Sequence, residues 1–149
     1  MMVDLSWSMA LRGSFQAAKK VALALNNLIT SQFSRDSLYI IGFSAYAREL
    51  KAEQLPYVRW AESVLGPNMH HAQMLAQNLL AKHKGGTRQI IMISDGEPTA
   101  HLERGRSYFA YPPSPITIRE TLKEVKRATQ KGITINTFML DRNYYLKEF

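Results

Sequence analysis

The chain has 149 residues, the usual size of one domain, and its 19 Lys and Arg against 12 Asp and Glu give a net charge of +7. Hydrophobic residues make up 46% and charged residues 21%, which is ordinary globular usage and excludes a disordered chain or a coiled coil. There are no cysteines, which excludes disulfides, zinc–thiolate sites and thiol nucleophiles.

No stretch approaches the roughly 18 apolar residues of a membrane span, and no secretion signal opens the chain. We therefore predict a cytoplasmic protein of bacterial type with no membrane partner. The basic residues are scattered through helical patterns without aromatic interleaving, which favours a solvated basic surface over nucleic-acid binding.

The apolar pattern alternates between strand and helix along the chain. In the first half it predicts a strand stub at 1–4, a helix at 14–33, a buried strand at 38–43, a short edge strand at 46–51 and helical segments at 56–64 and 69–83. In the second half it predicts a buried strand at 89–94, a long loop at 99–115 and a helix that opens with a capping box at 117–120. A strand at 133–140 and a helical start at 144–149 follow. The helix after the loop is expected to carry Ile118, Leu122 and Val125 inward.

Strands separated by such helices predict an α/β fold: a doubly wound, Rossmann-like, mainly parallel sheet with helices on both faces. The 46–51 strand follows its neighbour so closely that it must be an antiparallel edge strand. In such sheets ligands bind beyond the carboxyl ends of the strands. Asp4 and Asp95 each follow such an end, so their side chains should converge.

Asp4, Ser6 and Ser8 place a carboxylate and two hydroxyls at alternate positions after a strand. In an extended segment alternate side chains point the same way, and hard cations such as Mg²⁺ prefer oxygen ligands. With Asp95 they predict a metal site for Mg²⁺, Mn²⁺ or Ca²⁺. Neutral hydroxyls would leave the ion electrophilic, so that a partner's acidic side chain can complete its coordination. That arrangement favours binding over catalysis.

At these residues the sequence resembles the von Willebrand factor A (VWA) domain and its metal-ion-dependent adhesion site. The resemblance rests on Asp4 to Met9, the strand end at 42–44, the loop at 66–69 and Ser94 to Pro98, which occur in the family order. It implies one VWA-like domain over 1–149, short of the family's final strand and helix, that acts as a protein-binding module. Intracellular members of the family often work beside AAA+ ATPases, which makes such an ATPase a candidate partner by analogy.

One position departs from the family pattern. The family reads Gly-Thr-Asn where this chain reads Gly66-Pro67-Asn68, so a threonine hydroxyl ligand is missing. Water, Asn68 or a backbone carbonyl could take its place, and a weaker or metal-free site is the alternative.

Two alternatives to a binding module are enzymes, and one further pattern is a pair of histidines. Ser44, Asp95 and His101 follow the hydrolase order, but the glycine that completes a nucleophile elbow is absent. A Mg²⁺-dependent phosphoryl-transfer enzyme is the second alternative, although no phosphate-binding loop is present. His70 and His71 are neighbours in a predicted helix, which favours a surface role over a shared ion.

Overall fold

The computed structural model describes residues 1–11, 13–59 and 66–140. Its elements are β1 (Met2–Asp4), α1 (Trp7–Leu11), α2 (Ser14–Gln32), β2 (Ile40–Phe43), β3 (Ala47–Leu50), the 3₁₀ helix η1 (Ala52–Tyr57), α3 (Met69–Leu80), β4 (Arg88–Ser94), β5 (Ala100–Glu103), β6 (Arg106–Phe109), α4 (Pro115–Gln130) and β7 (Ile133–Met139). No helix among these described residues is long and apolar enough to cross a membrane. The predicted helical start at 144–149 and residues 60–64 of the predicted helical segment at 56–64 lie outside them.

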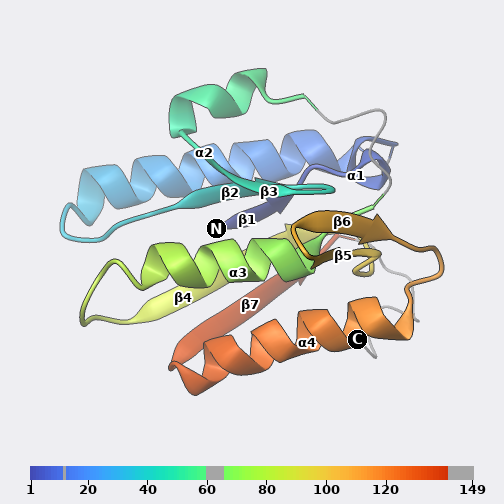
Figure 1. The fold of residues 1–149 in the computed structure, drawn as a ribbon. Coiled ribbons are helices and arrows are strands. Elements are labelled where there is room, and N and C mark those ends of the chain that lie inside the picture. Colours follow the sequence, from blue (N-terminus) through green and yellow to red (C-terminus); the bar gives the residue numbers. More distant parts are fainter. Residues whose placement is uncertain (12, 60–65, 141–149) are drawn as a thin grey trace.

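The central sheet has the strand order β3-β2-β1-β4-β7 (Figure 1). β1 pairs in parallel with β2 and with β4, β4 pairs in parallel with β7, and β3 is antiparallel to β2. The chain winds outward from β1 in one direction through β2 and in the other through β4. The strand order therefore reverses between β1 and β4, and ligands bind at such a point in open α/β sheets.

Helices cover the sheet on both faces, so the prediction of a doubly wound α/β fold with an antiparallel edge strand is confirmed. On one face α2 and η1 pack over a core that contains Val3, Phe15 and Ile93. On the other face α3 and α4 pack over a second core that contains Met2, Phe43 and Ile90. Figure 1 shows α3 and α4 side by side on the same side of the sheet.

The segment after β4 differs from the predicted long loop, because β5 and β6 form an antiparallel hairpin within it. The hairpin packs over the N-terminal part of α3, where the Ser107 N–H donates to the Tyr46 hydroxyl (3.2 Å) and Asn68 Nδ2 donates to Ser107 Oγ (3.2 Å). Arg104-Gly105, between the two short strands, was a turn signal that the prolines further along the segment obscured.

Two expectations about α4 are wrong. The helix begins at Pro115 and not at the 117–120 capping box, because the Ser114 side chain accepts from the Thr117 N–H at 3.1 Å and caps it earlier. Its buried face is also more polar than expected: Thr117, Thr121, Glu124 and Ala128 are buried. Ile118 and Val125 are only half-buried, and Leu122 is 47% exposed. The buried face of α4 is turned toward α3, where Gln77 Nε2 donates to Glu124 Oε2 at 3.0 Å.

Candidate functional site

The carboxyl ends of β1 and β4 bring polar side chains together at the reversal point of the sheet. β1 ends at Asp4, whose carboxylate is fully buried, and β4 ends at Ser94, directly before Asp95. Ser8 stands in the short helix α1 and Ser6 just before it. Residues far apart in sequence thus meet because parallel neighbouring strands end at one edge.

A chain of hydrogen bonds joins the four residues. The Ser6 N–H donates to Asp4 Oδ1 at 2.8 Å, and Ser6 Oγ lies 3.0 Å from Ser8 Oγ. Ser8 Oγ in turn donates to Asp95 Oδ1 at 2.9 Å. The structure therefore places all four residues proposed from the sequence in one cluster. α1 brings this about, since the turn at Trp7 replaces the extended segment that the alternate spacing suggested.

Ser94 belongs to the cluster although the sequence pointed to it only as part of the 94–98 segment and not as a site residue. Its hydroxyl donates to Asp4 Oδ2 at 2.6 Å and accepts from the Gly96 N–H at 3.2 Å, so it fixes the carboxylate and the turn that follows β4. Its position directly before Asp95, at the end of a buried strand, was the available signal. Ser94 orients Asp4 and leaves the other three side chains to line the cluster.

Burial raises the pKa of Asp4 from 3.8 to about 6, and the nearby Asp95 charge adds to the increase. Hydrogen bonds from Ser6 and Ser94 act in the opposite direction and do not overcome desolvation. A buried anion of this kind is stabilised by any cation that reaches it. The raised pKa of Asp4 is therefore compatible with a site that binds a cation.

The donor set determines which ion would fit. Carboxylate and hydroxyl oxygens suit hard cations such as Mg²⁺, Mn²⁺ and Ca²⁺, which usually retain bound water. Among the described residues, no group of three or more His, Cys, Asp or Glu side chains is arranged to hold a metal. An ion here would depend on Asp4, Asp95, the two serine hydroxyls and water, and those residues fit a hard cation.

The loop at 66–68 leaves little choice of replacement for the missing threonine. Asn68 is fully buried, its Oδ1 accepts from the His71 N–H at 2.9 Å to cap α3, and its Nδ2 donates to the Ala45 carbonyl at 2.9 Å. The Pro67 carbonyl accepts from the Ala100 N–H at 3.4 Å. Each of these oxygens already accepts one hydrogen bond that holds the fold, whereas water could take the ligand position without disturbing it.

Three histidines make hydrogen bonds that hold the fold and do not line the cluster. His70 and His71 are not surface residues of the helix: Nδ1 of His70 accepts from the Leu102 N–H (3.1 Å) and Nδ1 of His71 from the Ala47 N–H (3.0 Å). Burial lowers the pKa of both. His101 pairs through Nδ1 with Thr117 Oγ1 at 2.9 Å, so its hydrogen bond goes to α4 and not to Ser44. The predicted surface position of His70 and His71 is wrong because α3 lies between β3 and the hairpin.

Trp7 is 47% exposed at the start of α1. It therefore adds an aromatic surface on the element that contributes Ser8. The indole of an exposed Trp is a frequent anchor at protein interfaces.

An open α/β sheet with an Asp–Ser–Ser segment and an aspartate at its reversal point defines the class: a VWA-type domain. The chain belongs to the family described as "Rv0959-like protein, vWA domain", whose model matches residues 1–149. Its relatives include "Uncharacterized protein Rv0959" of Mycobacterium tuberculosis H37Rv and "Uncharacterized protein Mb0984" of Mycobacterium bovis, each 36% identical over 154 residues. The match covers 100% of this chain and 23% of each relative, so the chain spans about a quarter of their length.

A solved structure has the same fold. The pilus adhesin SpaC from Lactobacillus rhamnosus GG, in its open conformation, superposes with a TM-score of 0.66 at 18% identity and covers 97% of this chain and 24% of that protein. The VWA resemblance inferred from the motifs is thereby confirmed. Membership of the family indicates a protein-interaction module.

Proposed function

We propose that this domain binds a partner protein through a divalent cation held by Asp4, Ser6, Ser8 and Asp95, with an Asp or Glu of the partner completing the coordination. The observation that carries the proposal is the continuous hydrogen-bonded set of carboxylates and hydroxyls at the carboxyl ends of β1 and β4. When bound, the ion supplies a positive charge that a partner carboxylate can reach.

Each residue has a role in this proposal. Asp4, held by Ser94 and the Ser6 N–H, is a fixed anionic anchor at the base of the site. Ser6 and Ser8 offer neutral oxygens, so the ion keeps positive charge for the partner. Asp95, which is 2% exposed, contributes the second carboxylate from β4.

We also propose that the site binds and does not catalyse. In the candidate triad of Ser44, Asp95 and His101, the His101 Nδ1 that would face the aspartate is paired with Thr117 Oγ1 instead. A general base must lie within hydrogen-bond reach of the group it activates. Hydrolysis of an aryl phosphate that is lost in Asp4→Ala would overturn this part of the proposal.

Calorimetric titration with Mg²⁺ and with Mn²⁺ tests the cation site directly. We expect saturable binding by the native chain, loss of binding in Ser8→Ala and tighter binding in Pro67→Thr, which restores the missing hydroxyl. Ser37→Ala, which removes an exposed hydroxyl between α2 and β2, is the control and should bind like the native chain. Binding by Pro67→Thr alone would make the native site a metal-free scaffold, and binding by neither would refute the cation proposal.

A further inference from the structure

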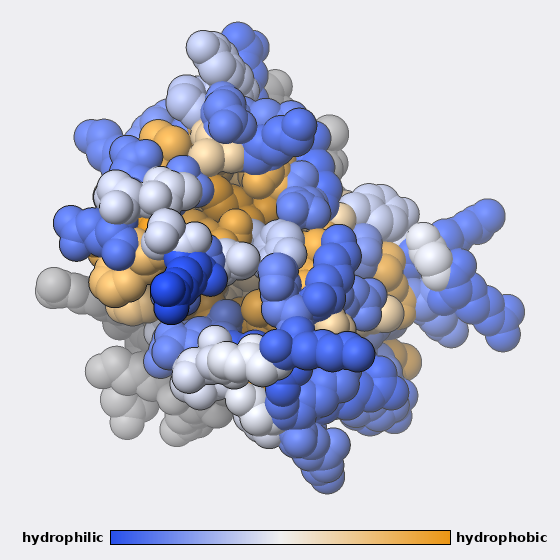
Figure 2. Space-filling model, turned by 90° about the vertical axis from the view of Figure 1, so that its left-hand side faces the viewer, coloured by the Kyte–Doolittle hydropathy of each residue, from blue (hydrophilic) through white to orange (hydrophobic). Residues whose placement is uncertain are grey.

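Two turns at the amino ends of β4 and β7 carry most of the positive charge of the chain. One turn joins α3 to β4 and the other joins α4 to β7, and both lie at the left-hand end of the molecule in Figure 1. Residues 82–88 and 124–132 contain six cationic side chains and one carboxylate, a net charge of +5 within the chain's total of +7. We call this surface the basic edge; its cations are Lys82, Lys84, Arg88, Lys126, Arg127 and Lys131. Figure 2 faces this end of the molecule and shows hydrophilic residues gathered over its lower part.

Hydrogen bonds hold the two turns side by side. Arg88 Nη2, at the start of β4, donates to the Lys131 carbonyl at 2.6 Å, and Lys131 Nζ donates to Gln77 Oε1 of α3 at 3.0 Å. Gln77 Nε2 donates in turn to Glu124 Oε2 of α4 at 3.0 Å. Residues of α3, β4 and α4 therefore fix the basic edge, so this surface is built by the fold and not by a single helix.

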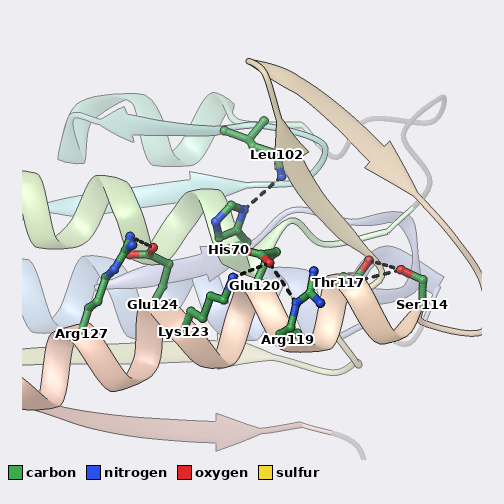
Figure 3. Close-up of polar contacts among 9 residues, drawn as sticks. All are labelled: His70, Leu102, Ser114, Thr117, Arg119, Glu120, Lys123, Glu124 and Arg127. Carbon is green, nitrogen blue, oxygen red and sulfur yellow. Dashed lines mark hydrogen bonds and ion pairs between the residues drawn. The ribbon is translucent and has the colours of Figure 1, made fainter.

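Carboxylates offset the cations earlier in α4 but not those around its end. Glu120 pairs with two cations and Glu124 with a third, as Figure 3 shows: Lys123 Nζ at 2.8 Å, Arg119 Nε at 3.2 Å and Arg127 Nη1 at 2.5 Å. In the described part of the chain, no carboxylate pairs with the exposed lysines Lys82, Lys84 and Lys126. The charge of these three side chains is therefore available to a ligand.

Helix dipoles account for only a small part of the charge at the basic edge. α3 ends here at Leu80 and α4 at Gln130, and cations are favourable beside the carboxyl end of a helix. Each helix end carries the equivalent of roughly half a negative charge, so the two ends offset about one positive charge. About four positive charges remain to be offset by something outside the described residues. Charge concentrated in this way speeds the association of anionic ligands.

The surroundings of these cations indicate which kind of anion fits. A compact phosphate is often held at a helix N-terminus, whereas the basic edge presents two helix C-termini. Its two arginines are used within the fold, since Arg88 holds Lys131 and Arg127 holds Glu124. The exposed lysines are point charges without the fork geometry that matches a phosphate, and neither turn contains a Phe, Tyr or Trp on which a base could stack. Spaced point charges suit carboxylates spread along a polypeptide.

We propose that the basic edge binds an acidic, extended segment of a partner protein. The carboxylates of the segment lie beside the three exposed lysines. Gly85 and Gly86, in the first turn, have nothing within 4 Å of an added Cβ, so the turn leaves the segment room to approach. The basic edge lies at the amino ends of the strands, opposite Asp4 and Asp95 at the carboxyl ends, so this proposal does not rest on the cation site.

Fluorescence anisotropy in EDTA with two labelled synthetic peptides of equal length tests the proposal. One peptide alternates Glu and Gly, and the other alternates Gln and Gly. EDTA removes divalent cations, so a carboxylate cannot bind through the proposed cation site. We expect the Glu–Gly peptide to bind saturably, with an affinity that falls as salt rises, and the Gln–Gly peptide not to bind.

Two double variants with the same change in net charge locate the contact. Lys82→Glu/Lys84→Glu reverses two exposed charges of the basic edge and should weaken binding of the Glu–Gly peptide about tenfold. Lys20→Glu/Lys51→Glu reverses two exposed lysines, one on α2 and one directly after β3, and should change the affinity less than about twofold. Urea unfolding checks that both variants are folded. If the first is not, Lys82→Gln/Lys84→Gln removes the same two charges without reversing them.

Three results would overturn the proposal. The first is no saturable binding of the Glu–Gly peptide in EDTA, or equal binding of the two peptides. The second is an equal loss of affinity in the two double variants, which would assign the binding to net charge alone. The third is tighter binding of a single-stranded oligothymidylate than of the Glu–Gly peptide at equal ligand charge and salt, which would assign the basic edge to nucleic acid.

Discussion

Replacing Asp4 by Asn should stabilise the metal-free protein near neutral pH. Burial raises the pKa of Asp4 from 3.8 to about 6, so the folded protein holds this proton more tightly than the unfolded chain does. The contribution of Asp4 to stability is then full below pH 3.8 and is lost as pH rises through about 6. At 1.36 kcal/mol per pKa unit the loss amounts to about 3 kcal/mol. Asn carries no such charge.

Urea unfolding in EDTA across pH 4 to 8 measures this difference. We expect the gap in unfolding free energy between Asp4→Asn and the native chain to open in favour of the variant between about pH 4 and 6 and to stay level above. Glu53→Gln, which changes an exposed carboxylate in η1, controls for the loss of one negative charge. A gap that does not change with pH, or that favours the native chain near neutral pH, would refute this account of Asp4.

The same comparison with Mg²⁺ present connects stability to binding. A ligand that binds only the folded state raises the free energy of unfolding by RT ln(1 + [L]/Kd), which is about 2.7 kcal/mol at a hundredfold excess over Kd. On our proposal Mg²⁺ stabilises the native chain and leaves Asp4→Asn nearly unaffected. The difference in unfolding free energy between the two proteins would then narrow, or change sign, when the ion is added.

Three further changes probe the surroundings of the site by urea unfolding. Gly66 has a φ of +83°, and a Cβ there would stand 1.8 Å from Thr99 Oγ1. Gly66→Ala should therefore lower the free energy of unfolding more than Gly132→Ala, where φ is +72° and nothing lies within 4 Å of an added Cβ. Equal losses of stability in the two variants would contradict the close approach to Thr99. Asn68→Ala removes the cap of α3 and the link to the hairpin and should lower stability by about 1–3 kcal/mol. Burial lowers the pKa of His70, so the stability that neutral His70 contributes is lost as pH falls below 6.5. His70→Gln should therefore make the free energy of unfolding less dependent on pH in this acidic range. The same pH dependence in the variant and the native chain would contradict this account.

The fold could be predicted largely from hydrophobic patterning. The buried runs at β2 and β4 and the helical spacing in α2 and α3 are long signals set by local sequence. Two features depend on tertiary context. The hairpin β5–β6 needs α3 beneath it, and the rotation of α4 reflects polar contacts with α3, such as Gln77 to Glu124, that no single-helix pattern reveals.

The candidate site was predictable to the level of its residues and not of its geometry. Asp4 and Asp95 follow strand ends, and parallel strand ends share one edge, so their meeting follows from topology. The roles of Ser94 and Asn68 do not follow in this way. Ser94 is recognised only once β1 and β4 are adjacent, and Asn68 only once its amide is seen to cap α3 and reach the hairpin.

The loop with Pro67 bears on whether the proposed cation binds despite the missing hydroxyl. The hairpin fixes this loop through the Ala100 N–H and through Asn68, so the loop is not available to swing a carbonyl toward an ion. Hard cations usually retain bound water, so water can take the ligand position that the threonine hydroxyl would fill. The buried Asp4 charge, which costs about 3 kcal/mol in the metal-free protein, would still favour an ion. On our proposal we therefore expect Pro67 to weaken the cation site without abolishing it, and Asp4 to matter more for ion binding than the loop at 66–68.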